Sequence, residues 1–269
     1  MIRCTDTFDH PTRAHFALSR LGPYLTGRVL DVGAGGSAAI FRGALGSSYV
    51  SVDLTDIRSK PDVFGDFEKC PLPFADRSFD TVLCFDVLEH LEDPYTVFSE
   101  CARVSVRSVI IALPNNWPGF FWSFVRGHNV SHLSGYGLPR EAPAPGHRHK
   151  WFFNIEEGEQ FIAAQAERAG FVIREVRHVY EPGGNALVYW YPYPIILGMS
   201  VQSIQNKHPG WVVPFLIAKH LIARPISWLE EILKRAIWGW GKYRYPNMFC
   251  RQLWVVLERP QEPPGLLST

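Results

Sequence analysis

A strand that runs directly into a glycine-rich turn contains the residues best placed for chemistry. The segment Val29–Val32 is apolar apart from Asp31, and Gly33 and Gly35 follow at once. Glycines let the backbone turn sharply and approach a ligand closely, and the next helix would point its first amides at the same place. A carboxylate at the carboxyl end of such a strand lies where open α/β sheets bind ligands. Asp31 therefore predicts a site for a ligand with a cationic amine.

The glycine spacing by itself fits more than one ligand. Residues 33–38 match the dinucleotide pattern G-x-G-x-x-G/A, and Asp53 follows about twenty residues later, where a carboxylate can bind a ribose hydroxyl. A nicotinamide-dependent oxidoreductase is therefore one alternative, although Asp31 and the lack of a second mononucleotide-binding half in the sequence argue against it. A catalytically silent cofactor-binding interaction module is another, and the intact Asp31, Asp53 and Asp66 argue against that.

The elements that must position these residues alternate between strands and helices. Short β-branched and apolar runs predict strands at 29–32, 49–53, 62–65, 79–85, 106–113, 171–178 and 252–258. Helical periodicity predicts helices at 11–25, 38–45, 95–104, 154–169 and 225–240. Asn154 and Glu157 have the spacing of a capping box, and Gly170 ends that helix. The alternation predicts an α/β domain with a mainly parallel sheet.

Three further blocks follow the glycine-rich turn: residues 50–54 around Asp53, then Gly65-Asp66-Phe67, then residues 72–91. Together with residues 29–35 they resemble, in order and spacing, the motifs of class I S-adenosylmethionine-dependent methyltransferases of the small-molecule type, over about residues 25–115. The resemblance implies a seven-stranded Rossmann-like sheet in the order 3-2-1-4-5-7-6. That sheet would be parallel except for an antiparallel last strand, and helices would cover both faces. The implied cofactor is S-adenosyl-L-methionine.

The resemblance also assigns roles to individual residues. Asp31 would hold the methionine amino group, and the backbone of residues 33–35 would lie against the methionine and ribose. Asp53 would accept hydrogen bonds from both ribose hydroxyls. Ser37 replaces the family's third glycine, which serves close packing.

The adenine end would be bound by the third block. Asp66 would accept from the adenine amino group, Phe67 would offer its backbone amide to the ring, and Phe85 would lie close to the methionine portion. The expected cofactor-binding residues are Asp31, Gly33, Ala34, Gly35, Asp53, Leu54, Asp66, Phe67 and Phe85.

Methyl transfer from a sulfonium mainly requires alignment and exclusion of water, because the leaving group is already activated. An oxygen or nitrogen nucleophile still benefits from losing its proton, and histidine is the usual base. His149 is the first candidate, because it precedes Phe152 and Phe153 in a pattern similar to one in many small-molecule methyltransferases. His147 is the second. The alternative for either is a solvated surface histidine.

Asp86, Glu89 and His90 offer a metal-binding alternative. At i, i+3 and i+4 of a helix these side chains share one face and could bind a divalent ion. A Glu-His-Leu run at this place is also common in the family without any metal. The expected site therefore has no metal, with this triad as the alternative.

Two insertions should determine the acceptor. Residues 115–151, rich in proline, glycine and aromatic side chains, are expected to form a lid over the transferred methyl group, or else an ordinary surface loop. Residues 180–249 are expected to form a helical insertion subdomain before the last strand. Its simplest role is packing on its own sheet. Its charged residues are mostly basic: lysines 207, 219, 234 and 242 and arginines 224, 235 and 244, against glutamates 181, 230 and 231.

Composition limits the remaining choices. The chain has 269 residues, is 46% hydrophobic and carries a net charge of +1, so one domain over 1–269 is expected and nucleic acid is a poor partner. Five cysteines without C-x-x-C spacing and an N-terminus without a signal-peptide core favour the cytoplasm. Peripheral membrane contact through 186–245 and a homodimer stay open. The predicted activity is methyl transfer to an oxygen or nitrogen of a small or medium organic acceptor, with an amphipathic or lipid-linked molecule favoured.

Overall fold

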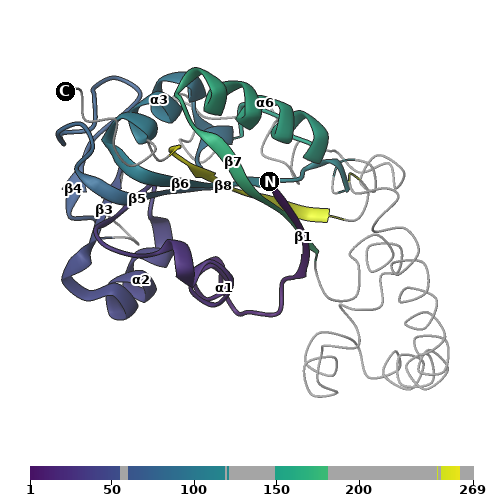
Figure 1. Cartoon of the computed structure of the whole chain (residues 1–269), viewed down its shortest axis with the longest axis horizontal. Coiled ribbons are helices and arrows are strands. Elements are labelled where there is room, and N and C mark those ends of the chain that lie inside the picture. Colours follow the sequence, from purple (N-terminus) through teal and green to yellow (C-terminus); the bar gives the residue numbers. More distant parts are fainter. Residues whose placement is uncertain (55–59, 119, 121–148, 181–246, 248–249, 261–269) are drawn as a thin grey trace, which may run out of the picture.

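The protein is an α/β domain built on one eight-stranded sheet (Figure 1). The structure, a computed structural model, describes residues 1–54, 60–118, 120, 149–180, 247 and 250–260. The strands are β1 Ile2–Thr7, β2 Val29–Val32, β3 Tyr49–Asp53, β4 Val63–Phe64, β5 Phe79–Phe85, β6 Ser105–Pro114, β7 Val172–Tyr180 and β8 Cys250–Glu258. The helices are α1 Arg13–Arg20, α2 Ala38–Leu45, α3 Pro94–Val104 and α6 Ile155–Arg168.

The strand order is β1-β7-β8-β6-β5-β2-β3-β4. From β4 to β7 this is the predicted order 3-2-1-4-5-7-6, so that prediction is confirmed. The last strand, β8, runs antiparallel to both β6 and β7, while every other pair is parallel. The Rossmann-like class is therefore confirmed, and the strand number is corrected from seven to eight.

The additional strand is β1, which pairs in parallel with β7 at the edge of the sheet. Sequence analysis missed it because its residues are polar and partly exposed, and no apolar alternation marks them. Ionic contacts hold it in place: Asp6 pairs with Arg177 of β7, and its Oδ1 accepts from Arg20 Nε of α1 at 3.2 Å. The edge strand thus ties the first helix to the strands around it.

Helices cover both faces of the sheet (Figure 1). Helices α3 and α6 lie over one face and α1 and α2 over the other. Two clusters of buried side chains fill the two interfaces. The strands in the middle are buried on both faces, as β2 shows with all four residues buried. Such strands are rigid supports for side chains at their ends.

Helix α6 begins and ends at the residues that the sequence predicts. Asn154 Oδ1 accepts from the Glu157 amide at 2.9 Å, and Glu157 Oε2 accepts from Asn154 Nδ2 at 2.8 Å, so the predicted cap of α6 is confirmed. Gly170 follows this helix with a φ of +72°, the left-handed conformation typical of a helix end. This cap fixes the start of α6 next to the segment that carries His149.

Several sequence predictions fall on residues that the structure does not describe. They are His147, most of the 115–151 lid, most of the 180–249 subdomain with its 225–240 helix, and the 186–245 membrane contact. Within the described ranges, no helix combines the length and apolar character needed to cross a membrane.

Candidate active site

Most of the predicted cofactor residues lie at the carboxyl ends of three adjacent strands. Strand β2 is paired with β3 on one side and β5 on the other, in parallel. Parallel pairing brings the ends of these strands to one edge, so the turns after Val32, Asp53 and Phe85 lie together. Open α/β sheets bind their ligands at such an edge.

Asp31 is buried with a defined partner. Its side chain is 2% exposed, and Oδ2 accepts from the Tyr49 hydroxyl at 2.6 Å. Burial raises the pKa of Asp31 to about 7, an effect that the Tyr49 hydrogen bond reduces and the charge of Asp53 increases. A cationic group beside Asp31 would favour its ionised form. The site therefore contains a carboxylate whose charge depends on what binds next to it.

The glycine turn is held against β3 by backbone and side-chain bonds. The Gly33 amide donates to the Val52 carbonyl at 2.9 Å, and the Gly35 amide donates to Asp53 Oδ2 at 2.9 Å. Gly33 has a φ of +71°, and a Cβ there would lie 2.4 Å from Val87 Cγ2. Only glycine fits that position without displacing Val87.

Asp53 and Asp66 are each tied to neighbouring groups. Asp53 Oδ1 accepts from the Leu54 amide at 2.7 Å, while the Leu54 side chain is exposed. Asp66 Oδ2 accepts from Lys69 Nζ at 2.6 Å, and this contact lowers the pKa of Asp66. Phe67 is buried against the sheet. Asp53 thus ends β3 as an acceptor, and Asp66 is an acceptor two residues beyond β4.

Phe85 ends β5 within an aromatic cluster. Its ring centroid lies 4.6 Å from that of Trp254 on β8 and 6.2 Å from that of Phe41 on α2. The ring is 8% exposed. Phe85 is therefore fixed in position at the end of β5 by rings from β8 and α2.

Asp86, a member of the predicted metal triad, directly follows Phe85 and is bound to other partners. Its backbone has a φ of +51°, its carboxylate pairs with Arg13, and its Oδ2 accepts from Gln252 Nε2 at 3.0 Å. Residues 88–90 form a 3-10 turn and not the α-helix on which the shared face was predicted. The structure groups His149, and not Asp86, with Glu89 and His90.

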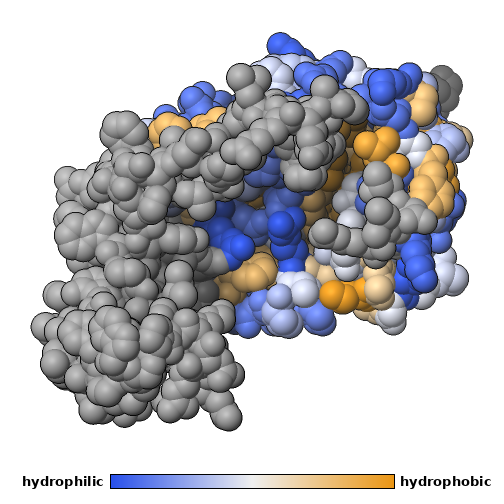
Figure 2. Space-filling model, turned by 180° about the vertical axis from the view of Figure 1, so that it is seen from behind, coloured by the Kyte–Doolittle hydropathy of each residue, from blue (hydrophilic) through white to orange (hydrophobic). Residues whose placement is uncertain are grey.

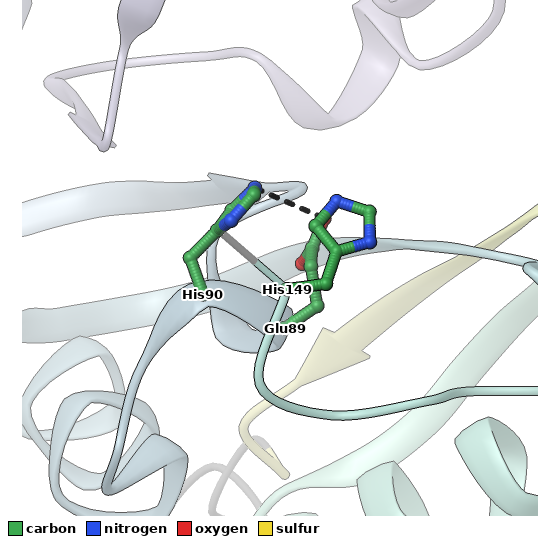
Figure 3. Close-up of side chains that lie close together, drawn as sticks. All are labelled: Glu89, His90 and His149. Carbon is green, nitrogen blue, oxygen red and sulfur yellow. Dashed lines mark ion pairs between the residues drawn. The ribbon is translucent and has the colours of Figure 1, made fainter. Parts of the chain in front are cut away.

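Glu89, His90 and His149 form a close group (Figure 3). One ligand atom from each lies within 4.8 Å of the others. His90 Nε2 is 3.8 Å from Glu89 Oε1, and the two imidazole centroids are 4.6 Å apart at 67°. Glu89 is 1% exposed, and burial raises its pKa well above the ordinary value, with Asp86 adding to the effect. Burial, with His90 and Arg13 nearby, lowers the pKa of His149 to about 4.

Backbone bonds hold His149 at this place. The amides of Lys150 and Trp151 both donate to the Glu89 carbonyl, at 2.7 and 3.2 Å, and Trp151 Nε1 donates to the Leu91 carbonyl at 2.8 Å. The chain at Lys150 and Trp151 is therefore anchored to the turn after β5. This explains how two residues separated by 60 positions come to share one site.

The surface of the described residues has a hollow with a polar lining. Seen from behind in Figure 2, the described surface is hollowed near its centre, and hydrophilic side chains line that hollow. Apolar residues are scattered around it and do not form one continuous patch. Such a hollow suits a ligand with charged and hydroxyl groups.

Sequence analysis missed three partners in this region: Tyr49, Arg13 and Gln252. The first could have been found, because the parallel register opposes Asp31 to Ser51 and so places Tyr49 two residues back on the same face. The other two come from α1 and β8, whose approach to Asp86 depends on the three-dimensional packing.

Comparisons with known proteins find methyltransferases. Residues 30–112 match the family model of a methyltransferase domain. The ubiquinone biosynthesis O-methyltransferase of Xanthomonas axonopodis pv. citri (strain 306) is 28% identical over 194 residues, and that of Xanthomonas euvesicatoria pv. vesicatoria (strain 85-10) is 29% identical over 195 residues. Both alignments cover 65% of this chain and 75% of the relative. A SAM-dependent methyltransferase structure from Archaeoglobus fulgidus is 18% identical, with 90% of this chain and 91% of that chain covered and a TM-score of 0.47.

Proposed function

Since the chain belongs to the class I S-adenosylmethionine-dependent methyltransferases, we propose that it methylates an oxygen of a small or medium organic acceptor. The observation that carries the proposal is the set of acidic side chains beside the glycine turn at one edge of the sheet. The names of the two Xanthomonas relatives favour oxygen over nitrogen as the acceptor atom. The cofactor, S-adenosylmethionine, supplies the methyl group as an activated sulfonium.

In this proposal three aspartates bind three successive parts of the cofactor: the amino group, the ribose and the adenine. Asp31 binds the methionine ammonium, Asp53 accepts from the ribose hydroxyls, and Asp66 accepts from the adenine amino group. Asp53 can do so while keeping its bonds to the Gly35 and Leu54 amides, because an ionised carboxylate has about four acceptor positions. The glycine turn, including Ala34, then lies against the methionine and ribose.

The acceptor binds beside Phe85 and His149. Phe85 forms a fixed aromatic wall, and His149 stands on the segment that joins the lid region to α6. With a pKa of about 4, the His149 imidazole is neutral at physiological pH and can accept a proton or a hydrogen bond, although as a weak base. We retain His149 as the residue that meets the acceptor's reacting group. The basic charge balance of 180–249 favours an amphipathic or lipid-linked acceptor.

Binding of S-adenosylhomocysteine tests the cofactor half of the proposal. Asp53→Ala should weaken binding by about 1.5 to 3 kcal/mol for each charged hydrogen bond lost, measured by isothermal titration calorimetry. Asp76→Ala is the matched control, because Asp76 is exposed and precedes β5 at its amino end. Equal affinity of Asp53→Ala and parent would show that the ribose assignment is wrong. Tighter binding of NAD than of S-adenosylhomocysteine would favour the oxidoreductase alternative.

A transfer assay tests the acceptor half. Cell extract separated into lipid, small-molecule, protein and RNA pools is incubated with the enzyme and S-adenosylmethionine labelled in its methyl group. We expect label in the lipid or small-molecule pool. Alkali-stable label on an amine would assign nitrogen as the acceptor atom, and label mainly in protein or RNA would refute the small-molecule proposal.

A further inference from the structure

We propose that Glu89, His90 and His149 form a binding site for a divalent transition-metal ion of the zinc type. The three residues come from two segments: Glu89 and His90 from the turn after β5, and His149 from the end of the lid region. Figure 3 shows the two imidazole rings side by side with the Glu89 carboxylate next to them. The site lies two residues beyond Val87, which contacts the glycine turn, and so borders the cofactor edge of the sheet.

The Glu89 carboxylate is the first observation that points to a ligand. It is 1% exposed, and its Oε2 atom accepts no hydrogen bond from any described residue. The nearby Arg13 guanidinium pairs with Asp86. A buried carboxylate oxygen without a partner is costly, and a bound cation removes that cost.

The two histidines supply the second observation. Imidazole nitrogens are common ligands of transition metals, and the two ring centroids are 4.6 Å apart, close enough for both rings to reach one ion. The backbone bonds from Lys150 and Trp151 to the Glu89 carbonyl hold both segments together before any ion arrives. The three side chains are therefore positioned by the fold and not only by chance proximity.

The donor set selects the class of ion. Two imidazole nitrogens with one carboxylate oxygen suit Zn²⁺ or another first-row transition ion, while Mg²⁺ and Ca²⁺ prefer sites made of oxygen ligands. In a tetrahedral Zn²⁺ site the ligand atoms are about 3.3 to 3.5 Å apart. The present spacing of up to 4.8 Å would have to contract by about 1.3 to 1.5 Å. Rotation of the two imidazole side chains can supply that movement.

Three protein ligands leave a fourth position open, which is typical of catalytic zinc sites. Resting on the proposed function, we infer that the acceptor hydroxyl binds there. The metal-bound hydroxyl would release its proton to solvent, and its oxygen would form the new C–O bond to the methyl carbon. The C–S bonding pair would return to sulfur and leave S-adenosylhomocysteine. The ion would then take the place of His149 as the group that activates the acceptor.

Direct metal binding tests the inference without any acceptor. The full-length protein is freed of metal, dialysed against Zn²⁺, Mn²⁺ or Mg²⁺ separately, and analysed for bound metal by mass spectrometry. We expect one Zn²⁺ per chain and weaker Mg²⁺ binding. Glu89→Gln and His149→Gln should each weaken Zn²⁺ binding at least about tenfold. The matched controls are Glu156→Gln and His15→Gln, two exposed residues outside the group.

Circular dichroism and the affinity for S-adenosylhomocysteine show whether each variant is folded. If Glu89→Gln does not fold, His149→Gln decides the question, because its ring is only partly buried. Unchanged Zn²⁺ stoichiometry and affinity in a folded His149→Gln would overturn the site, as would a parent protein that binds no Zn²⁺. A parent that binds S-adenosylhomocysteine but no Zn²⁺ refutes only this inference. A parent that binds Zn²⁺ but no S-adenosylhomocysteine refutes only the proposed cofactor roles.

Discussion

The raised pKa of Asp31 predicts that cofactor affinity depends on pH. In the free protein Asp31 has a pKa of about 7, because it is buried, and its hydrogen bond from Tyr49 only partly offsets that burial. The ammonium of S-adenosylhomocysteine would bind the ionised form. At acidic pH binding must first remove the Asp31 proton, so affinity should fall as pH decreases below about 7.

The expected size follows from the fraction of Asp31 that is ionised. With a pKa of about 7, that fraction is about 75% at pH 7.5 and about 3% at pH 5.5. If the bound ammonium keeps Asp31 ionised throughout, affinity falls about 25-fold over this range, or about 2 kcal/mol. The stability of the free protein depends on pH in the opposite direction. The raised pKa of Asp31 stabilises the folded state fully below the unfolded pKa of 3.8, and this stabilisation is lost as pH rises through about 7.

Isothermal titration calorimetry between pH 5.5 and 7.5 measures this dependence. Repeating the titration in buffers of different ionisation enthalpy counts the protons released. 5′-Methylthioadenosine is the matched control ligand, because it lacks the amino group and should bind equally at both pH values. Asp31→Asn should flatten the profile for S-adenosylhomocysteine, and Tyr49→Phe should shift its midpoint to higher pH. An affinity that stays constant with pH in the parent, or the same slope with methylthioadenosine, would refute the assignment of the amino group to Asp31.

Two further predictions concern the support of the site. Gly33→Ala should destabilise the protein by about 1 to 3 kcal/mol and weaken cofactor binding, because Gly33 has a φ of +71° and a Cβ there would overlap Val87. Thermal unfolding of the variant measures this loss of stability. Gly43→Ala in α2 is the control. Asn115→Ala should lower the free energy of unfolding by about 1 to 3 kcal/mol, because the buried Asn115 amide donates to the carbonyls of Asn247 and Cys250. Denaturant unfolding measures this change. A variant as stable as the parent would contradict the prediction.

The central sheet could be predicted from sequence because its strands are short apolar runs separated by clear turn and capping signals. The predicted ranges 38–45, 49–53 and 79–85 agree with α2, β3 and β5 residue for residue. The edge strand β1 could not be predicted in this way. Its stability comes from pairing with β7 and from the ion pair between Asp6 and Arg177, and both partners are far away in sequence.

Only part of the candidate site could be predicted from the sequence. Asp31 and Asp53 lie at the carboxyl ends of two strands that the family resemblance places side by side, so their meeting at one edge followed from the implied topology. The grouping of Glu89 with His149 did not, because it depends on a backbone bond from Lys150 across 61 positions. The helical spacing suggested Asp86 as the third member instead. In the structure Asp86 has a positive φ, and its carboxylate pairs with Arg13 and accepts from Gln252 instead.

The two halves of the site differ in how their polar groups are satisfied. Asp31, Asp53 and Asp66 already accept hydrogen bonds from the protein, so cofactor binding there adds to or exchanges bonds that exist. Such exchange has a modest net free energy. Glu89 instead keeps a buried oxygen without a partner among the described residues. The carboxylate with unused hydrogen-bonding capacity therefore lies beside the proposed acceptor position. Interactions gained there can favour the transition state over the bound cofactor, and that difference is what accelerates a reaction.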